Sequence, residues 1–492
     1  MPHLLMVQGT ASGVGKSLLV AGLLRYFTRK GLRCAPFKAQ NMSLHSGVTP
    51  KGEEIARAQI LQAQAARIPP DARMNPVLLK PEGGSIQVVL LGKVWGKATP
   101  FAPLPKEVFW DAIVESLSSL LAEYDLVCVE GMGSPAELNL RERDLANMSL
   151  ARHFHIPVLL VGDIEGGGVF AALYGTWALT QEDRGYFQGF IINKFRGNRE
   201  VLEPGIRELE RLTGVPVLGV LPYLSLRLDD EDGLNFTFRT RPYRPGMLRV
   251  GVVQLPHAAN LTDFRPLELE DDVYIRFVFP HEDLGTFDLL ILPGTKNTCY
   301  DLRLLQEASF GERLAGFLAQ GGVVLGVCGG FQMLGEVVRD PHGIEEKGEI
   351  QGLGLLPLET VLEREKVLGW ALGYAPRFGV QVTGYEIHHG RSFLTSSREP
   401  FFLLQREGTV FPEGVVQKDQ VFGTYLHGLF DEGAFRRAFL NHVRKLRGLP
   451  PGKAQGPSWR DFIEAELDRL ADCCAAHLNM PLLERILGLS ER

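Results

Sequence analysis

Short apolar runs alternate with longer amphipathic stretches through the N-terminal half of the chain. The apolar runs, rich in Val, Ile and Leu, predict buried strands at Leu4–Gln8, Arg33–Ala39, Asp125–Glu130, Pro157–Val161, Gly189–Asn193 and Pro216–Val220. The stretches with helical spacing are Ser17–Lys30, Glu53–Arg67, Lys106–Tyr124 and Glu200–Thr213. Strands that are apolar on both faces and separated by helices predict a parallel sheet covered on both sides.

A second alternating series follows a polar, basic, proline-containing segment over residues 237–247. Its predicted strands are Leu248–Gln254, Asp288–Leu292, Gly322–Val327, Phe378–Ile387 and Gln420–Tyr425, and Trp459–Leu487 is amphipathic and helical. The pattern therefore predicts an α/β protein with two parallel-sheet domains. We place them at 1–236 and 248–445, joined by a linker over 237–247 and followed by a helical tail over 446–492.

Composition narrows the class of protein. A chain of 492 residues is too long for one core, and 45% hydrophobic with 22% charged residues is typical of a globular enzyme. The net charge of −6 argues against a nucleic-acid-binding protein.

No apolar run approaches the roughly 20 residues that span a bilayer, and the N-terminus has no signal-peptide pattern. Six scattered cysteines, including the adjacent Cys473 and Cys474 in a helical pattern, favour a reduced, cytoplasmic setting. The composition, charge and cysteine content are also compatible with an oligomer.

Residues 9–17 (GTASGVGKS) lie between a predicted strand and a predicted helix and have the pattern of a phosphate-binding loop. Glycines let backbone N–H groups turn toward phosphate oxygens, and the helix N-terminus adds positive charge. The spacing departs from GxxxxGK[ST], because glycine comes one residue earlier and threonine follows it. The predicted nucleotide-binding residues are Gly9, Thr10, Gly13, Val14, Gly15, Lys16 and Ser17.

A magnesium site is predicted beside this loop. The Ser17 hydroxyl is one candidate ligand, as in other phosphate-binding loops. Glu130 and Asp163 each end an apolar strand, and the carboxyl ends of parallel strands meet where open α/β sheets bind ligands. Capping of the following helix is the alternative role for Asp163.

A cysteine stands at a second strand-to-helix turn. Residues 322–330 (GVVLGVCGG) place Cys328 between glycines at the end of an apolar strand, where a thiol is exposed to attack a carbonyl. Such a nucleophile needs a base, and His427 follows a short strand of the same domain. The group that orients His427 stays open: Leu429 stands where a glutamate would be expected, and Glu386 or a backbone carbonyl are the alternatives.

These motifs resemble known families. Residues 326–335 (GVCGGFQMLG) and 423–428 (GTYLHG) resemble class I glutamine amidotransferase domains, in particular those fused to ATP-dependent cobyrinate amidases, which also lack the usual glutamate. The N-terminal half resembles the dethiobiotin-synthetase-like P-loop fold. Residues 37–43 (FKAQNMS), 75–81 (NPVLLKP) and 293–298 (PGTKNT) are similar to cobyrinate amidase motifs, although Thr295 stands where serine is common. The resemblance covers nearly the whole chain up to about residue 445.

The resemblance implies an amidoligase of cobalamin biosynthesis. Its corrinoid substrate would be adenosylcobyrinic acid a,c-diamide, amidated at the b, d, e and g carboxylates to give cobyric acid. Cys328 and His427 would release ammonia from glutamine, and ATP with Mg²⁺ would activate each carboxylate as an acyl phosphate. Candidate substrate- or phosphate-binding residues are Lys38, Gln40, Asn41, Lys80, Asn193 and Lys194. Lys38 has the alternative of a solvated charge at a strand end.

Three other functions share parts of this pattern. An amidase that forms the a,c-diamide from cobyrinic acid uses the same chemistry on other carboxylates. A partitioning-type ATPase shares the P-loop fold but needs a second lysine early in the loop, where this chain has residues 10–13 (TASG). A degenerate amidotransferase domain that serves only as a scaffold would have no need of both Cys328 and His427.

Overall fold

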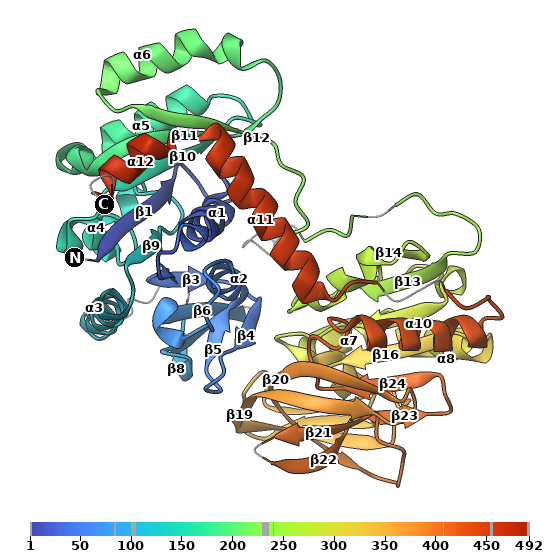
Figure 1. Cartoon of the computed structure of the whole chain (residues 1–492). Coiled ribbons are helices and arrows are strands. Elements are labelled where there is room, and N and C mark those ends of the chain that lie inside the picture. The colour runs from blue at the N-terminus through green and yellow to red at the C-terminus, as the bar shows by residue number, and fades with distance from the viewer. Residues whose placement is uncertain are drawn as a thin grey trace.

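The computed structural model describes residues 2–82, 85–99, 105–228, 236–239, 241–406, 408–452 and 456–489. Figure 1 shows two lobes, the N-terminal one in blue to green and the other in yellow to orange, with the red helix α11 reaching from one to the other. Within the predicted linker, Thr240 lies outside the described residues.

The N-terminal lobe is built on a six-stranded parallel sheet, which confirms the predicted fold class. In pairing order its strands are β12 (Val217–Pro222), β11 (Phe187–Phe195), β10 (Val158–Asp163), β1 (His3–Gly9), β9 (Leu126–Glu130) and β2 (Cys34–Phe37). Strand β1 is central and lies between β10 and β9. The carboxyl ends of these three strands therefore meet at one edge of the sheet, where Gly9, Glu130 and Asp163 lie.

Helices cover this sheet on both faces. They are α1 (Lys16–Arg29), α2 (Arg57–Ala65), α3 (Lys106–Glu123), α4 (Met148–Phe154), α5 (Val169–Leu179) and α6 (Glu203–Thr213). Helix α2 begins four residues later than predicted, because Glu54–Ala56 forms strand β5 and pairs with β4 (Ser46–Val48). Glu54 is fully buried, so tertiary packing outweighs the helical spacing of this segment.

A small sheet inserted after β2 was not predicted. It consists of β3 (Gln40–Met42), β6 (Val77–Glu82), β7 (Ser85–Leu90) and β8 (Lys93–Ala98). The β4–β5 hairpin of the same insertion reaches the second lobe, where the Trp370 indole N–H donates a 2.6 Å hydrogen bond to the Val48 carbonyl. The insertion thus forms part of the contact between the lobes.

The second lobe contains its own parallel sheet with one antiparallel edge strand. In pairing order the strands are β14 (Val273–Val278), β13 (Leu248–Val253), β15 (Leu289–Leu292), β16 (Val323–Val327), β24 (Val421–Thr424) and β23 (Val415–Gln417). The helices of this lobe are α7 (Thr298–Glu307), α8 (Phe310–Ala319), α9 (Gly329–Met333) and α10 (Gly433–Leu446). The carboxyl ends of β13, β15, β16 and β24 meet at one edge.

A mostly antiparallel sheet packs beside this core. Its strands are β18 (Gly348–Gln351), β17 (Val337–Asp340), β19 (Leu358–Ala375), β20 (Val380–Leu394), β21 (Phe402–Arg406) and β22 (Thr409–Glu413). The predicted strand Phe378–Ile387 overlaps the longer β20, which begins two residues later, after a turn, and pairs with β19 along most of its length. Cross-strand pairing carries β20 past the point where its apolar alternation ends.

The C-terminal helices return to the N-terminal lobe. Helices α11 (Trp459–His477) and α12 (Met480–Ile486) complete the apolar core formed by α1 and β1. A Cβ atom at Gly22 of α1 would lie 2.7 Å from the Cys474 sulfur, so glycine permits this close approach of α1 and α11. Cys474 is thus a packing residue, and the tail ties the end of the chain to its beginning.

The structure also bears on membrane insertion. Among the described residues, no helix is long and apolar enough to cross a bilayer.

A buried arginine tests the importance of this tail for stability. Arg25 is completely buried and donates a 2.7 Å hydrogen bond to Glu464 of α11, which is one-third exposed, whereas Arg29 makes a 2.7 Å ion pair with Asp472 that is exposed on both sides. We expect Arg25→Leu to lower the free energy of unfolding by about 2 kcal/mol, because the hydrogen bonds of the buried guanidinium to Glu464 and to the Gln64 carbonyl are lost. The matched variant Arg29→Leu should cost less than about 1 kcal/mol. Urea unfolding of both variants measures the difference, and equal losses would contradict the prediction.

Candidate functional site

Cys328 lies at the turn between β16 and α9. Its backbone φ of 52° is in the left-handed region, which is unfavourable for a cysteine and typical of a nucleophile held at a sharp turn. The turn leaves no room for a side chain at Gly330, because a Cβ atom there would lie 2.0 Å from the Leu292 carbonyl oxygen. The thiol is 3.9 Å from the Ile387 carbonyl oxygen, to which it donates.

His427 is held by a carboxylate that the sequence analysis missed. Its Nδ1 lies 2.5 Å from an Asp263 carboxylate oxygen, and both side chains are buried. Burial alone would lower the pKa of His427, but the charge and hydrogen bond of Asp263 outweigh it and, with a smaller effect of Cys328, raise this pKa to about 10. At neutral pH the imidazole is therefore protonated, and its neighbours are the Asp263 carboxylate and the Cys328 thiol.

Asp263 reaches this position from the segment that follows β13. Asn260, with φ 53°, precedes a 3₁₀ helix over Leu261–Leu269, and the Asp263 N–H donates to the Asn260 carbonyl. The Gly428 N–H also donates to Asp263, at 3.3 Å. The signal that could have identified it is an acidic residue in the loop that follows a buried parallel strand, although Asp263 lies ten residues past the end of β13.

Glu386, the predicted orienting residue, does not contact His427 in this structure. Its carboxylate accepts a hydrogen bond from Arg406 and lies 3.5 Å from His388 Nε2. Because side chains alternate along a strand, the neighbouring Tyr385 points the other way, and its ring stacks on His427 with centroids 5.2 Å apart. The prediction of Glu386 is therefore replaced by Asp263.

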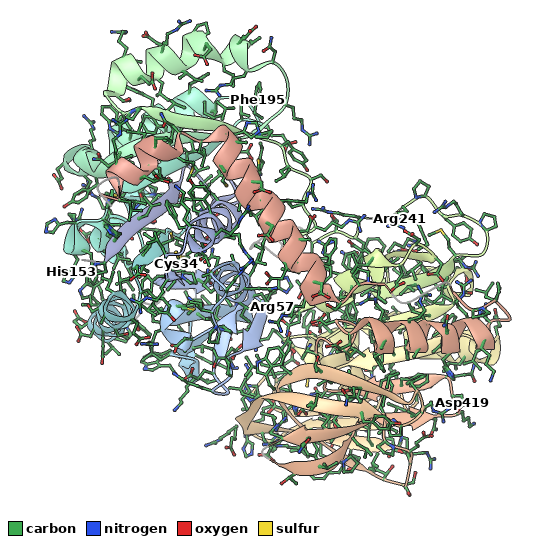
Figure 2. The ribbon with its side chains drawn as sticks, in the orientation of Figure 1. Cys34, Arg57, His153, Phe195, Arg241 and Asp419 are labelled. Atoms are coloured by element: carbon green, nitrogen blue, oxygen red, sulfur yellow. The ribbon has the colours of Figure 1, made fainter. Side chains whose placement is uncertain are left out.

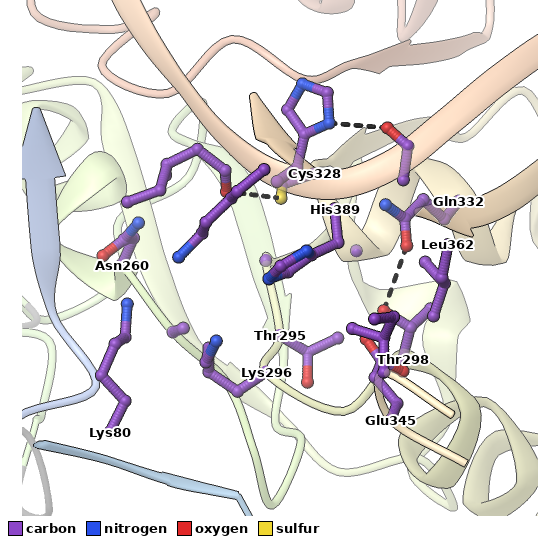
Figure 3. Close-up of a pocket in the computed structure, with 18 of the residues that line it drawn as sticks. Lys80, Asn260, Thr295, Lys296, Thr298, Cys328, Gln332, Glu345, Leu362 and His389 are labelled. Carbon is purple, nitrogen blue, oxygen red and sulfur yellow. Dashed lines mark hydrogen bonds between the residues drawn. The ribbon is translucent and has the colours of Figure 1, made fainter. Parts of the chain in front are cut away.

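The thiol opens into a pocket that both lobes line (Figure 3). The N-terminal lobe contributes Leu44 and Lys80. The remaining lining residues named in Figure 3 are Asn260, Thr295, Lys296, Thr298, Gln332, Glu345, Leu362 and His389. Thr298 donates a 3.1 Å hydrogen bond to Gln332, and burial raises the pKa of Glu345 to about 7. Cationic and acidic groups thus share a pocket beside the nucleophile, a combination that suits a zwitterionic amino acid.

The phosphate-binding loop forms the second candidate site. Gly15 has a φ of 96°, and a Cβ atom there would lie 2.3 Å from the Asn193 amide nitrogen. Asn193 donates to the Val14 carbonyl at 2.8 Å, and Lys194 donates to the Gly13 carbonyl at 2.7 Å. Both predicted phosphate-binding candidates therefore brace the backbone of the loop. Lys16, nearly buried, donates to the carbonyls of Ala11 and Gly133.

Glu130 is the centre of a buried polar cluster beside this loop. One of its carboxylate oxygens accepts from Ser17 at 2.8 Å and from Lys38 at 2.9 Å, and the other accepts from Gln62 at 2.6 Å. Burial raises the pKa of Glu130, but the charge and hydrogen bond of Lys38, the charge of Lys16 and the hydrogen bond of Gln62 together outweigh it and hold this pKa below its ordinary value. The carboxylate is therefore ionised, and Gln62 is a second residue that the sequence analysis missed.

The oxygen atoms of Ser17 and Glu130 fit a magnesium ion that also binds nucleotide phosphates, because Mg²⁺ commonly takes one or two protein oxygens. Asp163 is engaged elsewhere, in a 2.8 Å ion pair with Lys194, and it accepts the Glu165 N–H. Among the described residues, no group of three or more His, Cys, Asp and Glu side chains could hold a metal by itself.

The remaining candidates divide between the two sites. Asn41 is buried and donates to Gln59 at 2.9 Å, and Gln40 precedes it on β3, where Asn41 pairs with Leu78 of β6. Lys80, predicted to bind a carboxylate or phosphate, lines the thiol pocket instead. It forms a 2.5 Å ion pair with Glu54, which also pairs with Lys366 of the second lobe at 2.6 Å.

Comparisons with known proteins agree with this division. The model of the CobQ/CobB/MinD/ParA nucleotide binding domain matches residues 5–233, and that of the CobB/CobQ-like glutamine amidotransferase domain matches residues 249–435. The chain is 44% identical to a cobyric acid synthase of Caldanaerobacter subterraneus subsp. tengcongensis, over 99% of this chain and 98% of that protein. It is 46% identical to one of Desulforudis audaxviator and 44% identical to one of Salmonella typhimurium, each over 99% of both chains.

The role of Asp263 can be tested directly. We expect Asp263→Asn to lower the rate of glutamine hydrolysis at least about 100-fold, because His427 loses the charge that keeps it protonated and oriented. Since Asp263 raises the pKa of His427 to about 10, the alkaline limb of the remaining activity should move to lower pH. Glutamate release between pH 6 and about 10 measures both effects.

The matched control is Glu386→Gln, which removes the carboxylate that the structure keeps away from His427. It should retain its rate within about threefold and keep the pH profile. A larger loss in Glu386→Gln than in Asp263→Asn would contradict the assignment.

Proposed function

Because this chain belongs to the cobyric acid synthase family, we propose that it amidates the b, d, e and g carboxylates of adenosylcobyrinic acid a,c-diamide, using glutamine and ATP. The observation that carries the proposal is the presence, on one chain, of a thiol–imidazole–carboxylate triad and a phosphate-binding loop with a buried, ionised carboxylate. The first suits release of ammonia from an amide, and the second suits transfer of a phosphoryl group.

The first half-reaction takes place at Cys328. Its sulfur attacks the carboxamide carbon of glutamine as the thiolate that pairs with protonated His427, and His427 gives its proton to the departing nitrogen, so that ammonia leaves and a thioester forms. Water then attacks the thioester with neutral His427 as the base, which restores the thiolate and the imidazolium and releases glutamate. The Asp263 carboxylate stabilises the imidazolium at each stage.

The second half-reaction takes place at residues 9–17. A carboxylate is a poor electrophile at neutral pH, and transfer of the γ-phosphoryl group of ATP to its oxygen creates an acyl phosphate with a good leaving group. Ammonia attacks the acyl carbon, phosphate departs, and an amide forms with loss of a proton. Lys16 and Lys38 are positioned to neutralise phosphate charge, because both lie beside the ionised Glu130.

Magnesium would be held by Ser17 and Glu130 together with the phosphates of the nucleotide. Bound there, it would neutralise charge on the transferred phosphoryl group. To make room for an ion, Glu130 would exchange its hydrogen bonds from Ser17 and Lys38 for the metal, while Gln62 could continue to hold its other oxygen.

Two variants separate the half-reactions. Cys328→Ala should abolish amide formation from glutamine while free ammonia still supports it, because only the nucleophile is lost. Lys16→Ala should lower amide formation at least about 100-fold with either nitrogen source, because the phosphoryl transfer itself is impaired. Mass spectrometry of the corrinoid product follows each added amide. Loss of both activities in Cys328→Ala would contradict two separate sites.

The identity of the acid is tested with two substrates. We expect kcat/KM for adenosylcobyrinic acid a,c-diamide to exceed that for cobyrinic acid at least about 100-fold, with four amides added to the former. Residues 37–43 favour this acid through their similarity to the family motif. Preferential addition of two amides to cobyrinic acid would instead identify an a,c-diamide synthase.

A further inference from the structure

A loop of the N-terminal lobe reaches the surroundings of the catalytic histidine. The loop comprises residues 43–48, between β3 and the end of β4, and it contacts the second lobe at Asn260 and Tyr385. Asn260 immediately precedes the 3₁₀ helix that carries Asp263, whereas Tyr385 stacks on His427. The loop is therefore connected to His427 in two ways, through Asn260 and Asp263 and through Tyr385.

The contact with Asn260 has two hydrogen bonds. The Asn260 N–H donates to His45 Nδ1 at 3.1 Å, and the Ser46 N–H donates to the Asn260 side-chain oxygen at 3.1 Å. All three residues are nearly or fully buried. Burial lowers the pKa of His45 to about 4, so its ring is neutral and Nδ1 is free to accept. Loss of either bond would leave a buried polar group unpaired, which makes this docking specific.

The contact with Tyr385 reaches the ring that stacks on the imidazole. The Tyr385 hydroxyl donates to the Ser46 carbonyl at 3.4 Å, and the Tyr385 and His427 backbones exchange two hydrogen bonds. Arg57, labelled at the side of the first lobe in Figure 2, has its guanidinium carbon 5.7 Å from the centre of the Tyr385 ring. The same loop is therefore connected to His427 through its ring partner.

The loop also continues into the phosphate-binding site. Asn41 lies two residues before its first residue, and a chain of buried side-chain amides runs from there through Gln59 and Gln62 to Glu130. The Ser43 N–H donates to the Leu79 carbonyl, which fixes the start of the loop on β6. The segment that reaches the triad is thus anchored beside the carboxylate that faces Ser17 and Lys38.

We propose that His45 and Ser46, acting through Asn260, are positioning residues for glutamine hydrolysis, so that docking of the ATP domain holds Asp263 against His427. This inference rests on the proposed function. It adds that the triad of one domain is completed by a loop of the other, which would make ammonia release depend on the state of the domain that consumes ammonia.

The test uses pairs of variants in the full chain. Asn260→Gly keeps the left-handed backbone but removes the acceptor for Ser46, and Asn260→Asp restores an oxygen at that place. His45→Phe removes the acceptor for the Asn260 N–H, and His45→Asn restores one near the same position. His45 does not line the thiol pocket, so its variants act on glutamine only through other residues.

For Asn260→Gly and His45→Phe we expect kcat for glutamate release to fall at least about tenfold, and for His45→Phe, which lies outside the pocket, we expect KM for glutamine to change less than about twofold. Amidation driven by free ammonia should stay within about twofold of the original chain, and the Asp and Asn variants should recover most of kcat. This split distinguishes a positioning role from a general loss of folding, which would lower ammonia-driven amidation as well.

Unchanged kcat in both variants would overturn the inference, as would a rise in KM alone or a parallel loss of ammonia-driven amidation. Failure of the proposed function has a different signature. In that case the unaltered chain would form no amide from the corrinoid with glutamine and ATP, whatever the variants do to glutamate release.

Discussion

The hydrogen bond between His427 and Asp263 joins side chains 164 positions apart, and the arrangement of the second lobe serves to bring them together. A carboxylate and an imidazolium are each unfavourable in an apolar interior, and together they are stable only if their geometry is held. Parallel strands supply that geometry, because β13, β16 and β24 end at one edge and deliver Asp263, Cys328 and His427 to it.

The site at the phosphate-binding loop also depends on a buried charge whose geometry must be held, the carboxylate of Glu130. Glu130 has no exposed surface, and it stays ionised because Lys38 lies 2.9 Å away and two further side chains donate to its oxygens. The loop itself is braced by Asn193 and Lys194 from the far side of β10. Both sites therefore depend on buried charges whose partners come from distant parts of the chain, and neither can form before its sheet has assembled.

The seam between the lobes combines an apolar cluster, in which Val48 packs with Tyr385 and Ile387, with a buried group of charges. Glu54 pairs with Lys80 of its own lobe and Lys366 of the other, and these cations outweigh the effect of burial and hold its pKa well below the ordinary value. Removing Glu54 would leave the repulsion between Lys80 and Lys366 without this compensating carboxylate, so the cluster specifies one relative placement of the lobes. Helix α11 also restricts this placement, because the chain runs from the second lobe into this helix and the helix packs on α1.

Local signals determined much of this protein from the sequence alone. The alternation of apolar and amphipathic runs predicted both parallel sheets, and the glycine-flanked turns identified Lys16, Ser17 and Cys328, because those features depend only on neighbouring residues. Pattern could not show that Glu54–Ala56 pairs as a strand, nor that Lys80 turns toward the thiol pocket. Only the tertiary structure decided the partner of His427, because Glu386 on β20 contacts Arg406 instead, whereas the 3₁₀ helix over Leu261–Leu269 brings Asp263 to the imidazole.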